Sequence, residues 1–354
     1  MADRTPPTKE AIIEALKTVN DPELGKDLVS LGMIRDVGFG EGCVRLVVEL
    51  TTPACPMKGK IREDIEEALL RLEGVGQVDV EFTARVRSSL PQPEAIPGVQ
   101  NVVAIGAGKG GVGKSTVCVL TAVALARAGA KVGLMDADVY GPSIPKMLGI
   151  ESAQPALNGE NIVPVKACGL KVMSIGLLIP SDQAVIWRGP MIHNTVKQFL
   201  TGVDWGELDY LIVDLPPGTG DVPLTLAQSI PMTGSVIVCT PQEVALADAM
   251  RAAQMYEKLN VPVLGFIENM SYFIAPDTGT EYDLFGKGGA EQAAERANIP
   301  FLGSIPLNVA IRLSSDGGTP ETIFTDDVQG VGQTIASVVE RLAGQISVRA
   351  SRLS

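Results

Sequence analysis

Apolar runs without regular polar alternation recur along the chain from about residue 100 onward. Runs of this kind are typical of parallel strands that are covered by helices on both faces. Segments with helical spacing separate them, as in repeated β–α units. Strands are expected at Val102–Ile105, Val132–Met135, Leu170–Ile175, Tyr210–Leu215, Ser235–Thr240, Val263–Ile267 and Phe301–Ile305. The pattern predicts an α/β fold with a doubly wound, mostly parallel sheet, in which ligands bind at the carboxyl ends of the strands.

A shorter mixture of helix and strand patterns precedes that region. A helix is expected at Glu10–Val19, and a strand, a second helix and a returning strand follow it. The strands have apolar residues at alternate positions, and the second helix has them on one face. We therefore predict a small α+β domain at residues 1–88. Its apolar positions are Val44, Leu46, Val48 and Leu50 in the first strand, Ile61, Ile65, Leu69 and Leu72 in the helix, and Val78, Val80 and Phe82 in the returning strand.

Prolines recur between the two patterned regions, at Pro91, Pro93 and Pro97. Proline-spaced segments are semi-rigid and poor in regular structure. Residues 89–99 are therefore expected to form a linker, and residues 100–345 a second, larger domain. The last helix of that domain is expected near Gln333–Leu342, followed by a flexible tail at residues 346–354.

The loop after the first strand of the larger domain carries a phosphate-binding pattern, G-x-x-x-x-G-K-[ST]. Its glycines let backbone N–H groups wrap closely around a phosphate chain, where a Cβ would obstruct the path. Lys114 supplies a mobile charge for the β- and γ-phosphates, and Ser115 supplies a hydroxyl for Mg²⁺. An apolar helix expected at Ser115–Ala128 follows, as a phosphate loop requires. We predict that a nucleoside triphosphate binds at Gly108, Lys109, Gly110, Gly111, Val112, Gly113, Lys114, Ser115 and Thr116.

Polar side chains mark the ends of three further predicted strands. Asp136 and Asp138 follow the second strand, Asp214 lies at the end of the fourth, and Asn269 follows the sixth. An acidic residue after an apolar strand, beside a phosphate loop, is the expected partner of Mg²⁺. The alternative is that each side chain caps a turn. Gly218, in the proline- and glycine-rich segment after Asp214, is expected to donate its N–H to a γ-phosphate and to relax after hydrolysis.

Composition and charge narrow the possible functions. The 354 residues carry a formal net charge of −12, and the lack of a basic stripe argues against nucleic-acid binding. No apolar run reaches about 18 residues and the first residues lack a signal-peptide core, so neither a membrane span nor export is expected. Five irregularly spaced cysteines are typical of reduced thiols in the cytoplasm. The single histidine, His193, excludes the common metal-hydrolase motifs.

Lys109, directly after the first glycine, separates this loop from the ordinary phosphate loop. The stretch Gly-Lys-Gly-Gly-Val-Gly-Lys-Ser-Thr resembles the deviant Walker A motif of the Min/Par/nitrogenase-reductase class. Other segments are similar to the Mrp/ApbC branch, the iron–sulfur cluster carrier ATPases, over about Val102–Pro320. In the first domain, Asp21–Glu23 and Thr51–Pro56 are similar to the small SufT-type domain of many bacterial members. The segments in the larger domain are Asp136–Ser143, Trp187–Met191, Asp214–Asp221 and Asn269–Phe273.

The resemblance implies an ATPase that acts as a homodimer, with two ATP molecules held at its interface. Lys109 would reach the partner's phosphates, as an arginine finger does when it is supplied in trans. The implied function is to bind iron–sulfur clusters and to transfer them to apoproteins in an ATP-dependent way. Components of the cluster-assembly machinery would be further partners.

The resemblance also implies roles for the other residues of the nucleotide site. Lys114 and Ser115, together with Thr116, would hold the phosphates and Mg²⁺. Asp138 would orient the attacking water, and Asp214 would support Mg²⁺ through water. Asn269 would contact adenine. The implied catalytic set is Lys109, Lys114, Asp138 and Asp214.

The chain departs from the family where a cluster would be held. Many members carry Cys-Pro-x-Cys just after the segment Asn269–Phe273, and paired cysteines from two subunits give enough thiolates for a bridging [4Fe–4S] cluster. This chain has Ala275, Pro276, Asp277 and Thr278 there, so both thiolates are missing. A [4Fe–4S] cluster remains the implied cargo, but the usual bridging site does not carry over.

Cys55 is the cysteine that the sequence favours as an iron–sulfur contact. Pro56 suits the first position of a helix, so Cys55 is expected near the N-cap, where N–H groups would favour its thiolate. We hypothesise that Cys55 acts in cluster or iron transfer with Asp21 and Glu23. The alternative is a loop cysteine that only packs. Among the others, Cys118 and Cys239 are expected to be buried, Cys168 structural and Cys43 exposed.

Three other functions share parts of this pattern. A positioning ATPase that cycles on membrane or DNA needs a basic tail, for which Arg341, Arg349 and Arg352 are the only candidates. An adaptor would use ATP only to switch the dimer, without holding a cluster. A nitrogenase-type reductase needs cysteines in its switch loops, and Ser229–Thr233 has none. The carrier function is therefore preferred.

Overall fold

The computed structural model describes residues 7–89, 96–179 and 189–353 of the chain. These residues form two compact units. One contains the residues up to 87 together with those from 343 onward, and the other contains residues 88–342. The smaller unit thus combines the predicted N-terminal domain with the end of the chain.

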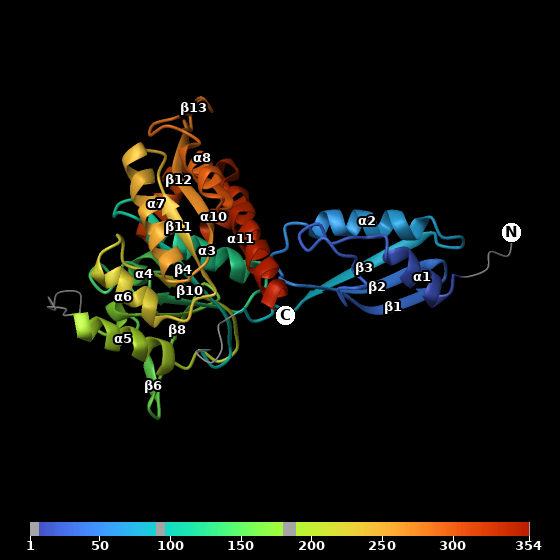
Figure 1. The fold of residues 1–354 in the computed structure, drawn as a ribbon, viewed down its shortest axis with the longest axis horizontal. Helices are drawn as coiled ribbons and strands as arrows, with labels where there is room; N and C mark the ends of the chain where they lie inside the picture. The colour runs from blue at the N-terminus through green and yellow to red at the C-terminus, as the bar shows by residue number, and fades with distance from the viewer. Residues whose placement is uncertain (1–6, 90–95, 180–188, 354) are drawn as a thin grey trace. The chain divides into compact units, whose positions relative to one another are not determined.

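The smaller unit contains the elements α1 (Lys9–Leu16), β1 (Ile34–Gly40), β2 (Cys43–Leu50), α2 (Lys58–Leu70) and β3 (Gln77–Ala84) (Figure 1). Its sheet has the order β1-β2-β3, with β1 antiparallel and β3 parallel to β2. The predicted apolar positions of β2 are all buried, as are Ile61, Ile65 and Leu69 of α2. The sequence did not predict β1, because a register shift between Ile34 and Asp36 breaks its alternation.

The larger unit is built on a sheet whose longer strands are β4 (Val99–Gly106), β5 (Val132–Asp136), β9 (Leu170–Ser174), β10 (Leu208–Asp214), β11 (Gly234–Cys239), β12 (Val263–Ile274) and β14 (Phe301–Leu307). These seven are parallel, and each contains most of a predicted strand. Their order is β14-β12-β11-β4-β10-β5-β9. Two short antiparallel strands, β8 (Val165–Ala167) and β13 (Glu281–Tyr282), pair with β9 and β12. The doubly wound α/β prediction is confirmed.

Helices connect these strands and bury the sheet. α3 (Lys114–Arg127) contacts β4, β5 and β10, and nearly all of its residues are buried. Apolar residues of α5 (Gly189–Thr201), α6 (Asp221–Ser229), α7 (Glu243–Lys258) and α8 (Gly289–Ala297) share one cluster with the sheet. The remaining elements are α4 (Ile144–Met147), the hairpin β6 (Ala156–Asn158) and β7 (Asn161–Val163), η1 (Ile175–Leu177), α9 (Val309–Gly317), α10 (Thr322–Thr325), η2 (Val328–Gly330) and α11 (Val331–Leu353).

The end of the chain differs from its prediction. α11 continues to Leu353, so the expectation of a flexible tail at residues 346–354 is wrong over the part that the structure describes. Ile346 and Ala350 are buried and continue the apolar spacing of Leu342, which extends the helix beyond its predicted end. Among the described helices, none is both long enough and apolar enough to cross a bilayer.

The predicted linker is only partly described. Ser88 and Ser89 belong to the larger unit, and their hydroxyls donate to the Gln100 carbonyl and to Asn101 Oδ1. The larger unit therefore begins before residue 100, while residues 90–95 lie outside the described residues.

Candidate functional site

The phosphate loop lies where the sequence predicts it, between the end of β4 at Gly106 and the start of α3 at Lys114. Gly113 caps α3 with a φ of 79°, in the left-handed region that favours glycine. Gly108 faces a different constraint, because a Cβ there would lie 2.2 Å from the backbone oxygen of Asp248 in α7. One glycine is thus required by its backbone conformation and the other by the close approach of a helix.

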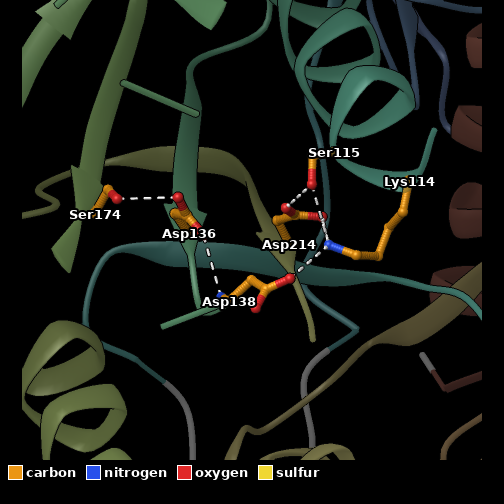
Figure 2. Close-up of polar contacts among 6 residues, drawn as sticks. All are labelled: Lys114, Ser115, Asp136, Asp138, Ser174 and Asp214. Carbon is orange, nitrogen blue, oxygen red and sulfur yellow. Dashed lines mark hydrogen bonds and ion pairs between the residues drawn. The ribbon is translucent and has the colours of Figure 1, made fainter. Parts of the chain in front are cut away.

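The side chains of Lys114 and Ser115 converge on Asp214 at the end of β10 (Figure 2). Lys114 Nζ donates to Asp214 Oδ1 at 2.6 Å and lies 3.7 Å from Asp138 Oδ2. Ser115 Oγ donates to Asp214 Oδ2 at 2.6 Å. Parallel pairing aligns Asp214 with Asp136 across β10 and β5, so both carboxylates stand at the carboxyl edge of the sheet. The sequence-predicted Mg²⁺ and phosphate residues are therefore brought together.

Burial dominates the electrostatics of this cluster. Asp214 is fully buried, and burial raises its pKa, although the charge of Lys114 and the hydroxyl of Ser115 oppose that rise. Burial alone would lower the pKa of Lys114, but the nearby charges of Asp214 and Asp138 outweigh it and hold the pKa above its ordinary value. The cluster therefore keeps a protonated lysine next to carboxylate oxygens.

Asp136 is a member of the site that sequence reasoning mentioned but did not assign. It is fully buried, accepts from Ser174 Oγ at 2.9 Å and accepts from the Asp138 backbone N–H at 3.1 Å (Figure 2). Ser174 Oγ also accepts from the Gly176 N–H, at the start of η1. Asp136 thereby fixes the backbone of Asp138. The sequence feature that could have predicted this role is the position of Asp136, at the end of an apolar strand and two residues before Asp138.

The titration of Asp136 leads to a prediction about stability. Burial, and then the charge of Asp214, raise its pKa to about 8. A raised pKa means that the folded state binds the proton more tightly than the unfolded state, so this stabilisation is present at acidic pH and is lost as the pH rises through about 8. An Asp136→Asn variant should therefore gain stability relative to the parent as the pH rises.

The measurement is the free energy of unfolding in urea for parent and variant, at about pH 5 and about pH 8. The exposed Asp283→Asn provides a matched carboxylate-to-amide control. A variant-minus-parent difference that is the same at both pH values would contradict the prediction.

A cleft of about 240 Å³ lies at the phosphate loop, lined among others by Lys109, Gly110, Gly111, Gly113, Thr116 and Asp138. Asn269 Nδ2 donates to the Val112 carbonyl at 2.9 Å, so Asn269 braces the phosphate loop, a contact that the sequence did not predict. The Gly218 N–H, which was expected to donate to a γ-phosphate, has a partner within the protein. It donates to the Ala107 carbonyl at 2.8 Å, because the segment after β10 runs beside the start of the loop.

Cys55 also differs from its expectation. The N-cap of α2 is Met57, so Cys55 lies two residues before it, buried in the apolar cluster of the smaller unit. The Asp21 carboxylate accepts the backbone N–H groups of Glu23 and Leu24. Within the described residues no three His, Cys, Asp or Glu side chains are grouped to hold a metal ion, so the proposed set of Cys55, Asp21 and Glu23 is not assembled as one.

The other cysteines largely follow their expectations. Cys118 and Cys239 are buried, and burial raises the pKa of the Cys118 thiol and raises that of Cys239 to about 12. Cys168 Sγ donates to Glu321 at 3.1 Å. Cys43 is half-buried rather than exposed, because β1 and β3 flank it in the sheet.

The chain matches two known protein families and is similar to several curated proteins. The family described as NUBPL iron-transfer P-loop NTPase matches residues 98–343, and the family described as iron-sulfur cluster assembly protein matches residues 9–80. The chain is 53% identical to the iron-sulfur cluster carrier protein of Deinococcus radiodurans over 341 residues, which are 96% of each chain. It is 49% identical to the iron-sulfur cluster carrier protein of Synechocystis over 350 residues, covering 97% of this chain and 99% of the relative.

A solved structure is similar to about two thirds of the chain. It is the nucleotide-binding protein of Archaeoglobus fulgidus in complex with ADP, 43% identical, with a TM-score of 0.58. The similarity covers 64% of this chain and 89% of that chain. The matches thus span both units of the chain.

Proposed function

The chain belongs to the family of P-loop NTPases that carry iron–sulfur clusters, and on that premise we propose that it binds and hydrolyses Mg·ATP to deliver clusters to apoproteins. The chain is about half identical to cluster carriers over nearly its full length, and this similarity favours the carrier function over a positioning ATPase. The single observation that carries the nucleotide part is the meeting of Lys114, Ser115 and Asp214 beside the phosphate loop.

The donor atoms at this meeting point fit Mg²⁺. The Ser115 hydroxyl and the Asp214 carboxylate are hard oxygen donors within 2.6 Å of each other, and Mg²⁺ is commonly held by one or two such groups with water and substrate phosphates. Ser115 would hold the ion directly and Asp214 through water. A Mg²⁺ ion held there would neutralise charge on the β- and γ-phosphates.

Each remaining residue has a role in the proposed hydrolysis. The backbone N–H groups of the phosphate loop and the ammonium of Lys114 hold the phosphates. Asp138, fixed by Asp136, orients the water that attacks the γ-phosphorus. Asn269 reaches adenine from its position against Val112, which makes ATP the proposed nucleotide. The Gly218 N–H would have to leave the Ala107 carbonyl to reach a phosphate.

We propose that the active form is a homodimer in the cytoplasm. Lys109 is half-buried at the cleft. A positive charge supplied by a second copy of the chain stabilises the transition state of phosphoryl transfer. In the proposed dimer, Lys109 of each chain supplies this charge at the γ-phosphate bound by the other chain. Cluster-assembly components would load the dimer, and apo iron–sulfur proteins would receive the cluster.

The cluster is cargo in this proposal, and Cys55 is the thiol proposed to contact it. Cys118 and Cys239 lie in the larger unit with 0% and 1% of their surface exposed, so they are less accessible to a cluster than Cys55. Cys55 has 8% of its surface exposed and belongs to the unit that matches the cluster-assembly family. Its partner ligands would come from a second copy or from the client.

The test of the proposed function is anaerobic reconstitution of the full chain with iron and sulfide. Iron, sulfide and visible absorbance are measured, followed by transfer to an apo-ferredoxin with ATP, with ADP or without nucleotide. The proposal expects a bound [4Fe–4S] cluster, ATP hydrolysis and transfer that depends on nucleotide. Hydrolysis without any bound or transferred cluster would instead indicate the ATP-switched adaptor.

A Cys55→Ala variant is expected to retain about half or less of the parent's cluster iron after reconstitution, because one thiolate ligand is lost. Iron per chain and the rate of transfer are the measurements. Cys43→Ala, in the same unit, is the control and should behave as the parent. Equal iron content and transfer in Cys55→Ala and the parent would remove Cys55 from the proposed function.

A further inference from the structure

Two neighbouring residues of β12, Glu268 and Asn269, hold different parts of the larger unit. Asn269 is bonded to the phosphate loop at the Val112 carbonyl. Glu268, which has none of its surface exposed, faces the segment that runs from residue 270 to the start of α8. β12 contacts both β13 and α8, the two elements that follow it (Figure 1). We call residues 270–288 the β12–α8 segment.

The Glu268 carboxylate accepts three hydrogen bonds, two from the ends of the β12–α8 segment and one from the first turn of α8. Ser271 Oγ donates to Oε1 at 2.5 Å, and the Gly288 N–H donates to the same oxygen at 3.1 Å. The Ala290 N–H, in the first turn of α8, donates to Oε2 at 2.8 Å. One buried carboxylate is therefore hydrogen-bonded to both ends of the segment and holds these ends close together.

Glu268 also replaces a missing helix cap. The N-cap of α8 is Gly288, which has no side chain to satisfy the first N–H groups of the helix. A negative charge at a helix N-terminus is favourable, and hydrogen bonds to a charged acceptor are stronger than neutral ones. The start of α8 therefore depends on a residue in a different element.

A second connection leads from the same place to the phosphate loop through α7. A Cβ at Gly289 would lie 2.6 Å from the Leu246 side chain, so α8 begins directly against α7. Gly108 of the phosphate loop lies against the backbone of Asp248, two residues further along α7. The phosphate loop and the start of α8 thus share a rigid neighbour, in addition to the link through Glu268 and Asn269.

We propose that Glu268 is a positioning residue that couples nucleotide binding at the phosphate loop to the β12–α8 segment. Movement of the loop shifts Asn269, and the adjacent Glu268 transmits the shift to both ends of the segment through its three acceptor contacts. The segment presents the exposed side chains of Tyr282, Leu284 and Phe285, so a change in its position alters a surface away from the nucleotide. The proposal rests on the nucleotide site proposed above.

The test is hydrogen–deuterium exchange on the full chain with and without Mg²⁺ and a non-hydrolysable ATP analogue. In the parent, nucleotide should slow exchange in residues 106–116 and also in residues 270–290. In Glu268→Gln, an amide N–H₂ faces one of the three donors, so one or more contacts are lost. Slowing in 106–116 should remain, and the nucleotide effect on 270–290 should fall about tenfold.

The matched control is Glu295→Gln, which makes the same change at an exposed position of α8 and should keep the parent's response. A purely structural cap gives a different result, because exchange in 270–290 would then rise equally with and without nucleotide and the nucleotide effect would be preserved. That outcome overturns the coupling. If Glu268→Gln does not fold, Ser271→Ala removes one donor and leaves the carboxylate, and a partial loss of the nucleotide effect is expected.

The result for the parent separates this proposal from the proposed function. If nucleotide slows exchange in 106–116 but leaves 270–290 unchanged, the coupling is wrong and the nucleotide site stands. If neither region responds and calorimetry detects no binding, both are overturned.

Discussion

A Lys114→Ala variant is expected to lose ATP turnover by about 100-fold or more, because the charge that holds the β- and γ-phosphates is removed. It should also be less stable by about 3–5 kcal/mol, since the buried Asp214 carboxylate loses its ammonium partner. Phosphate release measures turnover, urea unfolding measures stability, and calorimetry measures the accompanying loss of nucleotide affinity. No other single substitution in the site should affect both binding and stability so strongly.

The control for Lys114→Ala is Lys166→Ala, which removes an exposed lysine on β8 and should leave turnover and stability unchanged. Ser115→Ala separates folding from function, because the Lys114–Asp214 ion pair remains in it while the hydroxyl for Mg²⁺ is lost. Its turnover should fall and its ATP affinity should become insensitive to Mg²⁺. A folded Lys114→Ala that hydrolyses ATP at the parental rate would contradict the proposed site.

A Lys109→Ala variant is expected to hydrolyse ATP about 1000-fold more slowly while it still binds nucleotide within a few-fold of the parent, because a charge supplied in trans acts mainly on the transition state. Lys109 forms no ion pair with any described carboxylate, so its loss should cost little stability. Steady-state hydrolysis and calorimetric affinity give the two quantities.

The dimer provides an independent check on Lys109. Light scattering of the parent with the non-hydrolysable ATP analogue should give twice the mass of the chain, and mixing Lys109→Ala with a Lys114→Ala partner should restore part of the activity. In the mixed dimer, the intact site binds nucleotide through its own Lys114 and receives Lys109 from the other chain. A parent that remains monomeric with nucleotide, or a Lys109→Ala variant with parental turnover, would overturn the proposed dimer.

Local patterns predicted much of the fold because each relied on near neighbours in the sequence. The apolar runs gave the parallel strands, since a strand covered on both faces has no polar side to expose. The phosphate loop was predictable because its glycines and Lys114 perform their roles within a few residues of each other. Predictions were less accurate where an element depends on distant contacts. α11 extends past residue 346 because Ile346 and Ala350 are buried; their spacing follows that of Leu342, but spacing alone does not establish burial.

The sequence by itself determined that this chain has a phosphate loop at the end of a parallel strand, with acidic side chains on strands nearby. Only the tertiary structure decided which distant residues support that loop. Asp136 is hydrogen-bonded to Ser174, Asn269 is hydrogen-bonded to Val112, and Glu268 of β12 caps α8, which follows after β13. These contacts join residues far apart in the chain. A local pattern specifies which atoms need a partner, whereas the packing of the sheet and helices determines which partner is near.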